Sequence, residues 1–160
     1  LAARYDRRVL VERGVDAREI EISVLGNEEI IVSQPGEIVP GDEFYTYKDK
    51  YHSGDPETAI PAPLPEQVSE QLRTWAVQTF RAIDGAGLAR VDFLLDKNTG
   101  KAWFNEINTM PGFTQISMYS KLLLHSGIEY KQLIDRLIEL GLERKAEQVR
   151  TIRKFEVDNE

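Results

Sequence analysis

The 160-residue chain contains no cysteine, so no disulfide framework can stabilise it. No apolar run approaches the ~20 residues that a transmembrane helix needs. The N-terminus also lacks the apolar segment of a signal peptide. Together these absences predict a cytoplasmic protein with no membrane partner.

Positive charge is scarce as well. Lys and Arg number 20 against 27 Asp and Glu, which gives a net charge of −7. No basic cluster is dense enough to follow a phosphate backbone, so nucleic acid is not expected as a partner. Hydrophobic residues make up 41% and charged residues 29%, the composition of a soluble globular domain with a core of its own.

An initiator methionine is also missing. Residues 1–6 resemble the last turns of a helix already begun, with no residue to cap its start. We therefore expect the chain to be a fragment of a longer protein.

Hydrophobic periodicity predicts strands and helices in mixed order. Alternating apolar residues indicate a half-buried strand over 19–25, and a turn at 26–29 leads to a strand at 30–32. Residues 41–65 have no clear period, and a loop of this length in a compact domain is usually functional or disordered. Antiparallel hairpins mixed with helices predict an α+β fold. The other elements expected are strands at 8–12 and 37–39, helices at 66–85, 117–125 and 130–140, and a charged stretch from 143.

The most informative segment is a predicted hairpin. Two apolar runs, 88–95 and 102–108, flank a turn-rich sequence that contains Gly100. Because side chains alternate faces along a strand, Arg90 and Asp92 share one face. A loop of about five residues places Asp92 opposite Glu106 and Arg90 opposite Asn108, with all four on the same face.

These four side chains suggest a metal site. Carboxylates that face each other across a ladder repel unless a cation lies between them. Two carboxylates, Asp92 and Glu106, with the amide oxygen of Asn108 form an all-oxygen ligand set that suits Mg²⁺ or Mn²⁺. Arg90 then suits a phosphate or a developing oxyanion. The alternative is that alternate polar residues merely mark a half-solvated sheet.

The loop at 109–114 adds an anion-binding feature. It leads into the helix expected from Ser117, and a helix N-terminus offers free backbone N–H groups to an anion. Metal ligands, an arginine and a helix N-terminus together indicate phosphoryl chemistry.

The sequence at this point resembles a known family. The run 88–95 (LARVDFLL), followed by 104–108 (FNEIN) and 109–114 (TMPGFT), is similar to the C-terminal part of D-alanine–D-alanine ligases, which are ATP-grasp enzymes of bacterial cell-wall synthesis. The resemblance extends upstream through 9–13 and 44–51 and downstream to about Leu142. It implies an ATP-grasp C-terminal subdomain over 1–142, with a mostly antiparallel mixed sheet and flanking helices. Residues 143–160 would form a charged tail, and the N-terminal domain and first ATP-grasp subdomain would be absent.

The resemblance also implies an activity. ATP phosphorylates the carboxylate of one D-alanine, and the amine of a second then displaces phosphate to give the dipeptide for peptidoglycan precursors. Two Mg²⁺ (or Mn²⁺) ions, held by Asp92, Glu106 and Asn108, would bind the ATP phosphates, with Glu106 shared between them. The full-length protein would be a homodimer through its N-terminal domain.

Four residues resemble the catalytic groups of the family. Arg90, together with a backbone N–H at Gly112, would stabilise the tetrahedral oxyanion; a structural ion pair with Asp92 is compatible with that role. Lys50 would close over the γ-phosphate from the long loop and exclude water. Tyr51 would select D-alanine as second substrate. Without the resemblance, Lys50 and Tyr51 are better explained as ordinary polar residues on the protein surface.

The remaining assignments concern ATP and the second D-alanine. Glu19 would bind the ribose, although an alternating strand also explains a polar residue there. Ser117 would hold the carboxylate of the second D-alanine with the backbone of Met118, and it also suits a helix cap. The adenine hinge departs from the family, since arginine replaces its usual lysine and Gly14 replaces a bulkier residue. The residues assigned to the nucleotide in addition are Glu12, Arg13, Val15, Lys50 and Asn105.

Two other functions compete with this one. The chain could belong to another ATP-grasp carboxylate–amine ligase, or it could be a non-catalytic remnant that binds nucleotide. Since it lacks a glycine-rich phosphate loop and the acid that holds the first D-alanine, we expect the isolated chain to be inactive.

Overall fold

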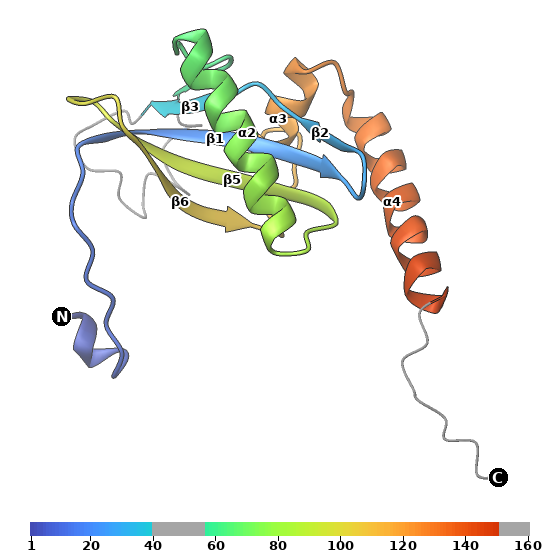
Figure 1. Ribbon diagram of the computed structural model, residues 1–160, viewed down its shortest axis with the longest axis horizontal. Coiled ribbons are helices and arrows are strands. Elements are labelled where there is room, and N and C mark those ends of the chain that lie inside the picture. The colour runs from blue at the N-terminus through green and yellow to red at the C-terminus, as the bar shows by residue number, and fades with distance from the viewer. Residues whose placement is uncertain (40–56, 151–160) are drawn as a thin grey trace.

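The computed structural model describes residues 1–39 and 57–150, and its centre is a six-stranded antiparallel sheet (Figure 1). The strand order is β4-β3-β1-β5-β6, and β2 pairs with the end of β1. The expected α+β class is confirmed. The strands are β1 (Ala17–Gly26), β2 (Ile30–Val32), β3 (Gly36–Val39), β4 (Glu57–Ala59), β5 (Gly87–Asp96) and β6 (Ala102–Asn108).

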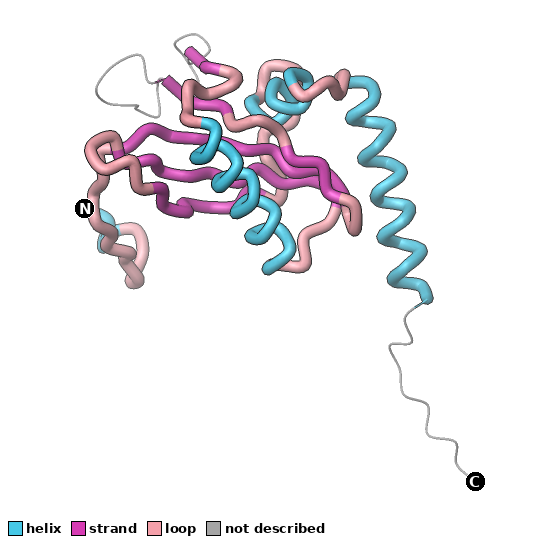
Figure 2. Tube along the Cα trace, turned by 45° about the horizontal axis from the view of Figure 1, so that its top comes forward, coloured by secondary structure: helices cyan, strands magenta, loops and turns pink. Residues whose placement is uncertain are grey.

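Helices cover the two faces of the sheet unequally. Helix α2 (Glu66–Ala82) crosses one face, while α3 (Met118–His125) and α4 (Tyr130–Arg150) pack at one end of the other (Figures 1 and 2). A 3-10 helix, η1 (Ala2–Arg4), precedes them. The rest of the second face carries no helix within the described ranges, and the polar site lies there.

The core under α2 follows from sequence period. Leu72, Ala76 and Phe80 recur at helical spacing and are fully buried against alternate residues of β1 and β5. The even-numbered residues of β1 and the odd-numbered residues of β5 face this helix, so their neighbours in sequence face the other side. The sheet contributors are Ile20, Ile22, Val24, Ala89, Val91, Phe93 and Leu95.

A second cluster joins α3 and α4 to the opposite face. Leu25 of β1 pairs with Leu88 of β5, and both contact the apolar cluster of Tyr119, Leu123 and Leu133. This cover buries the odd-numbered face of β1, so Glu21 and Ser23 are fully enclosed. The prediction that β1 is half-buried was therefore wrong from Ile20 onward.

Two other expectations fail. Residues 8–12 form no strand: they pair with no described strand, and Leu10 and Val11 are 80% and 87% exposed. The last helix does not end at Gly141 but continues to Arg150, so residues 143–150 of the expected tail are helical. Within the expected loop, β4 occupies 57–59, while residues 40–56 lie outside the description.

No helix in residues 1–39 or 57–150 combines the length and apolar character needed to cross a membrane.

The continuation of α4 generates a stability prediction. Gly141 lies within a regular helix, and a methyl group there would meet no atom within 4 Å. Gly141→Ala should therefore raise the free energy of unfolding by about 0.5–1 kcal/mol, measured by urea denaturation. Gly26→Ala is the matched control and should destabilise, because Gly26 has φ of +142° and a Cβ would collide with the carbonyl oxygen of Glu29. A loss of stability in Gly141→Ala would contradict the continuous helix.

Candidate functional site

The polar residues of the site form two rows across three strands. Glu21 of β1 pairs with Asp92 of β5, and Asp92 pairs with Glu106 of β6. One step along the strands, Ser23, Arg90 and Asn108 form a second row. The predicted pairing of Asp92 with Glu106 and of Arg90 with Asn108 is confirmed, and β1 adds two residues to the array.

A β-bulge in β6 makes this register possible. Near the turn Phe93 pairs with Phe104, but beyond it Asp92 pairs with Glu106, so Asn105 is the extra residue. In a regular strand Phe104 and Glu106 would share a face. The bulge lets Phe104 contact Phe93 on the α2 side, at 6.3 Å between ring centroids, while Glu106 faces Asp92 on the other. Without it, Ile107 would face the polar side.

Arg90 bridges the buried carboxylates. Its Nε donates to Asp92 Oδ1 and its Nη2 to Asp92 Oδ2, both at 2.8 Å, in a bidentate pair. Its Nε also lies 3.2 Å from Glu21 Oε2. Glu21 and Asp92 are each 1% exposed. One guanidinium therefore forms ion pairs with two carboxylates that are almost completely shielded from solvent. The Arg90–Asp92 ion pair considered in the sequence analysis is present.

These contacts keep Arg90 charged. Burial alone lowers the pKa of the guanidinium, but the hydrogen bonds to Asp92 and the charges of Glu21, Asp92 and Glu19 raise its pKa above the ordinary value. Arg90 is therefore a permanent cation in the middle of an acidic array.

Asn108 joins the two predicted metal-binding carboxylates. Its amide Nδ2 donates to Asp92 Oδ2 at 3.0 Å and to Glu106 Oε1 at 3.1 Å. A cation held by the same residues would use those carboxylate oxygens and the opposite end of the amide, Oδ1.

The donor set fits a hard divalent cation. Asp92, Glu106 and Asn108 converge on one point from two adjacent strands, and each offers oxygen. Glu19, Glu21 and Asp92 form an overlapping group whose carboxylate oxygens lie within 4.8 Å of one another. The structure thus brings the three predicted ligands together.

Glu21 was missed at the sequence level. The alternating pattern of 19–25 places it on the polar face, and that pattern is typical of solvent exposure. Its burial depends on its neighbours: β3 and β5 flank β1 on either side, and α3 covers the end of the same face. Pairing β1 with β5 in register, Glu21 against Asp92, is the signal that could have found it.

The next row of the same face combines one carboxylate with two apolar side chains. Glu19 pairs with Leu94, and Leu94 pairs with Trp103 of β6. Lys101 Nζ lies 3.8 Å from the ring centroid of Trp103. Glu19, the predicted ribose ligand, therefore stands next to the carboxylate row and in register with Leu94 and Trp103.

The predicted adenine hinge lies beside the β5–β6 turn. The backbone of Lys97 donates to Asp16 O at 3.0 Å, and Lys97 Nζ pairs with Asp16 Oδ1 at 2.7 Å. Hydrogen bonds from Thr99 lower the pKa of Asp96, and the charge of Arg13 contributes. Glu12 and Arg13 are exposed coil. The chain that carries these residues is thus tied to the β5–β6 turn through Asp16, while Asn105 is exposed in the bulge.

The loop that leads into α3 has its own hydrogen bonds. Ser117 occupies the N-cap position, but its Oγ accepts from Thr114 N at 3.1 Å and makes no bond to the helix. The capping alternative for Ser117 is therefore wrong. A Cβ at Gly112 would lie 3.2 Å from Ser117 Oγ, and Arg90 is not within 4 Å of that position. Met118 is buried, so only its backbone is available to a ligand.

A buried network connects α3 to the site strands. Ser23 Oγ donates to Tyr119 O at 3.1 Å, and Tyr119 Oη donates to Val24 O at 3.2 Å. Burial raises the pKa of Tyr119, so its hydroxyl stays a donor. Ser33 Oγ also accepts from Ser23 N at 2.9 Å. These bonds hold the start of α3 in place relative to Arg90, which pairs with Ser23.

Lys50 and Tyr51, the remaining predicted site residues, lie outside the described residues.

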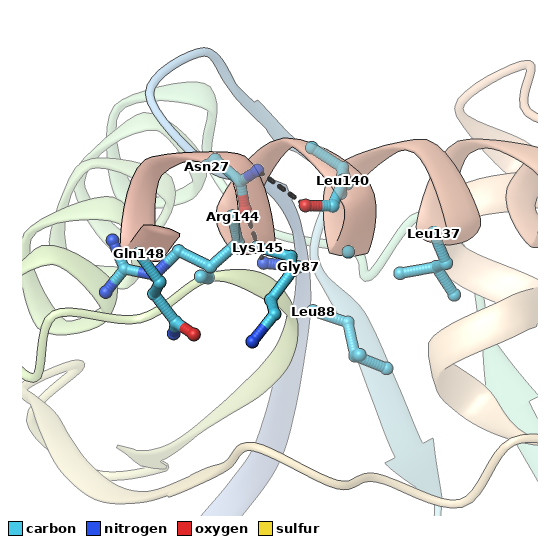
Figure 3. Close-up of a pocket in the computed structure, with 10 residues that line it drawn as sticks. Asn27, Gly87, Leu88, Leu137, Leu140, Arg144, Lys145 and Gln148 are labelled. Carbon is cyan, nitrogen blue, oxygen red and sulfur yellow. Dashed lines mark hydrogen bonds between the residues drawn. The ribbon is translucent and has the colours of Figure 1, made fainter. Parts of the chain in front are cut away.

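A separate groove of about 430 Å³ lies between α4 and the start of β5, lined by Leu88, Leu137 and Lys145 among others (Figure 3). Asn27 closes one side by donating to Leu140 O at 3.0 Å and accepting from Gly87 N at 3.1 Å. This groove contains none of the predicted site residues.

The chain is similar to one known protein family and to curated members of that family. A family model described as "D-ala D-ala ligase C-terminus" covers residues 1–139. Over 149 residues the chain is 55% identical to the D-alanine–D-alanine ligase of Heliobacterium modesticaldum, covering 93% of this chain and 41% of that protein. The ligase of Acetivibrio thermocellus is also 55% identical, over 89% of this chain and 38% of its own length. The chain therefore spans about two fifths of these curated relatives.

Solved structures agree. The D-alanine–D-alanine ligase of Coxiella burnetii superimposes with a TM-score of 0.77 at 41% identity, covering 92% of this chain and 38% of that one. The VanG D-Ala:D-Ser ligase of Enterococcus faecalis gives a TM-score of 0.68 at 31% identity, over 79% of this chain and 37% of its own.

The Arg90 contacts generate a prediction for stability. Arg90→Met should lower the free energy of unfolding by about 3–5 kcal/mol, because it leaves Glu21 and Asp92 buried without their cation. The measurement is urea denaturation of the 160-residue chain. The control is Arg18→Met, which removes another bidentate pair, to Glu37, that is more exposed and should cost about 1 kcal/mol or less. Equal losses of unfolding free energy in the two variants would contradict the conclusion that Arg90 compensates two buried carboxylates.

Proposed function

Since the chain belongs to the D-alanine–D-alanine ligase family, we propose that it forms the catalytic C-terminal part of an ATP-dependent ligase that joins two D-alanines. The observation that carries this proposal is the array of Asp92, Glu106, Asn108 and Arg90 on adjacent strands. Three oxygen donors and a permanent cation at one place suit phosphoryl transfer to a carboxylate followed by acyl transfer.

The metal-binding residues in this proposal are Asp92, Glu106 and Asn108. Divalent cations bound there would neutralise charge on the ATP phosphates during transfer. Rigid strands hold all three residues, and the bulge at Asn105 aims Glu106 at Asp92. Glu19 binds the ribose, and Leu94 and Trp103 offer an apolar surface for the adenine. Glu12, Arg13 and Val15 bind the adenine, and Asn105 completes the nucleotide contacts.

The reaction has two steps. The carboxylate of the first D-alanine attacks the γ-phosphorus of ATP, releasing ADP and forming an acyl phosphate. The amine of the second D-alanine attacks the carbonyl carbon, and inorganic phosphate leaves as the tetrahedral intermediate collapses. Arg90, with the backbone N–H of Gly112, stabilises the oxyanion of that intermediate. Support for Arg90 comes from its permanent charge beside the metal-binding carboxylates.

The second substrate is held from α3 and from the long loop. Ser117 and the backbone N–H of Met118 receive its carboxylate at the start of α3, where no side chain caps the first-turn N–H groups. Lys50 covers the γ-phosphate and Tyr51 selects D-alanine; both proposals rest on the sequence motif alone. The family role in peptidoglycan precursor synthesis, a cytoplasmic location and a homodimeric full-length enzyme complete the proposal.

D-Serine is the second candidate for the attacking amine, because one similar structure is a D-Ala:D-Ser ligase. The higher identity to D-alanine–D-alanine ligases favours D-alanine. Mass spectrometry of products from equimolar D-alanine and D-serine separates the two: a mixed dipeptide in excess would favour D-serine.

The activity is best tested in a chimera. Residues 1–139 of this chain replace the matching segment of the Heliobacterium modesticaldum ligase, which supplies the other three fifths of an enzyme. We expect D-alanine-dependent ADP release and D-alanyl-D-alanine from the chimera. The 160-residue chain alone should form no dipeptide, because lost substrate positioning removes ~7–11 kcal/mol of barrier lowering. Dipeptide synthesis by the purified 160-residue chain alone would contradict the proposal that it needs the rest of the enzyme for activity.

The metal assignment predicts a specific loss. Glu106→Gln in the chimera should lower kcat by about 100-fold or more, because the bridging charge disappears while the side chain keeps its size. The measurement is ADP release across a range of Mg²⁺ concentrations. Glu139→Gln, an exposed carboxylate on α4, is the control and should leave kcat unchanged. Parental activity of Glu106→Gln at every Mg²⁺ concentration would show that Glu106 binds no catalytic metal.

A further inference from the structure

Glu21 has a position in the site that the proposed function does not use. It lies on β1, directly opposite Asp92, with β5 between it and the two β6 residues, Glu106 and Asn108. Its carboxylate is 1% exposed, and Oε2 lies 3.2 Å from Arg90 Nε. A buried carboxylate next to Asp92 is unfavourable unless nearby cations or hydrogen-bond donors compensate its charge, and Arg90 is one such cation.

The contacts of Asp92 indicate why Arg90 would need a second carboxylate partner. Both of its oxygens accept hydrogen bonds from Arg90, and Oδ2 also accepts from Asn108. If Asp92 binds a divalent cation, as proposed, its oxygens must be shared between the cation and Arg90. A cation close to Oδ1 or Oδ2 also repels the guanidinium. Arg90 then needs a second anchor that the cation does not take.

Glu21 is placed to be that anchor. It reaches Arg90 from β1, whereas the proposed ligands Glu106 and Asn108 reach Asp92 from β6 on the opposite side. Asp92 accepts hydrogen bonds from Nε and Nη2, and Glu21 adds an ion pair to Nε from the opposite neighbouring strand, at 3.2 Å. A guanidinium that carboxylates on two strands hold keeps its orientation better when one of those carboxylates also binds a cation.

We propose that Glu21 is a positioning residue for Arg90: it holds the guanidinium in the orientation that stabilises the oxyanion when Asp92 is engaged by a metal ion. This inference rests on the proposed function. The rival explanation is that Glu21 is itself a metal ligand, because its carboxylate also lies within 4.8 Å of those of Glu19 and Asp92.

The two explanations differ in what Glu21→Gln changes. A positioning residue acts on the transition state, so kcat falls about 10- to 100-fold, less than the loss of an oxyanion donor itself. The KM values for ATP and D-alanine should stay within about 3-fold. Raising the Mg²⁺ concentration should not restore kcat. A metal ligand would show the opposite: activity would return at high Mg²⁺.

A binding measurement accompanies the kinetics. The increase in melting temperature that Mg²⁺ with a non-hydrolysable ATP analogue causes should be equal in Glu21→Gln and in the unmodified chimera. Glu21→Asp keeps the charge and should recover part of kcat. Glu37→Gln is the matched control: it removes a carboxylate that is also paired with an arginine, Arg18, on the same sheet, and it should leave kcat unchanged.

Each outcome decides the matter. Parental kcat in Glu21→Gln, recovery at high Mg²⁺, or a lost response to the analogue would overturn the positioning role. If Glu21→Gln shows no folding transition, Glu21→Asp carries the test, and equal losses in kcat and in the response to the analogue would overturn the proposal. An unmodified chimera that forms no dipeptide would instead refute the proposed function.

Discussion

The polar half of the sheet depends on one guanidinium. Glu21, Asp92 and Glu106 stand side by side on three adjacent strands, and two of them are almost fully buried. Like charges at such positions repel, and removal from water adds to the cost. Arg90 offsets both through two bonds of 2.8 Å to Asp92 and a contact of 3.2 Å to Glu21. The array can be buried because this cation is fixed within it.

The array also needs a change of register within a single strand. Phe104 must face α2 to contact Phe93, while Glu106, two residues later, must face the opposite side. A regular strand cannot do both, since residues two apart share a face. The bulge at Asn105 resolves this conflict, so packing on one face of β6 and chemistry on the other can coexist.

Sequence reasoning succeeded where local rules decide the outcome. The period of two, with a loop of about five residues, pairs Asp92 with Glu106 and Arg90 with Asn108, and both pairs are present. The observed turn pairs Leu95 with Ala102, so these two pairs also require the bulge. Sequence reasoning reached them without it. It could not find the bulge, because the expected register assumed that the strands pair without interruption from the turn.

Sequence reasoning failed where the burial or secondary structure of a residue depends on segments that are distant in the sequence. Strand 8–12 has the right composition but finds no partner among the described strands. Glu21 is buried because β3, β5 and α3 surround β1, which alternation alone cannot indicate. Gly141 stays helical because neighbouring residues maintain the hydrogen bonds, and glycine is unfavourable in a helix by only about 1 kcal/mol.

Charge balance connects the fold to the chemistry. Three carboxylates and one guanidinium leave the rows with a formal net charge of −2, which the divalent cations of the proposed function would offset. Asn108 holds Asp92 and Glu106 together through its Nδ2, so the two carboxylates are already converged before any cation binds. Rotation of one amide would then replace two N–H donors by an oxygen ligand. The strands thus bring Asp92, Glu106 and Asn108 together, and their arrangement depends on Arg90 staying where Glu21 and Asp92 hold it.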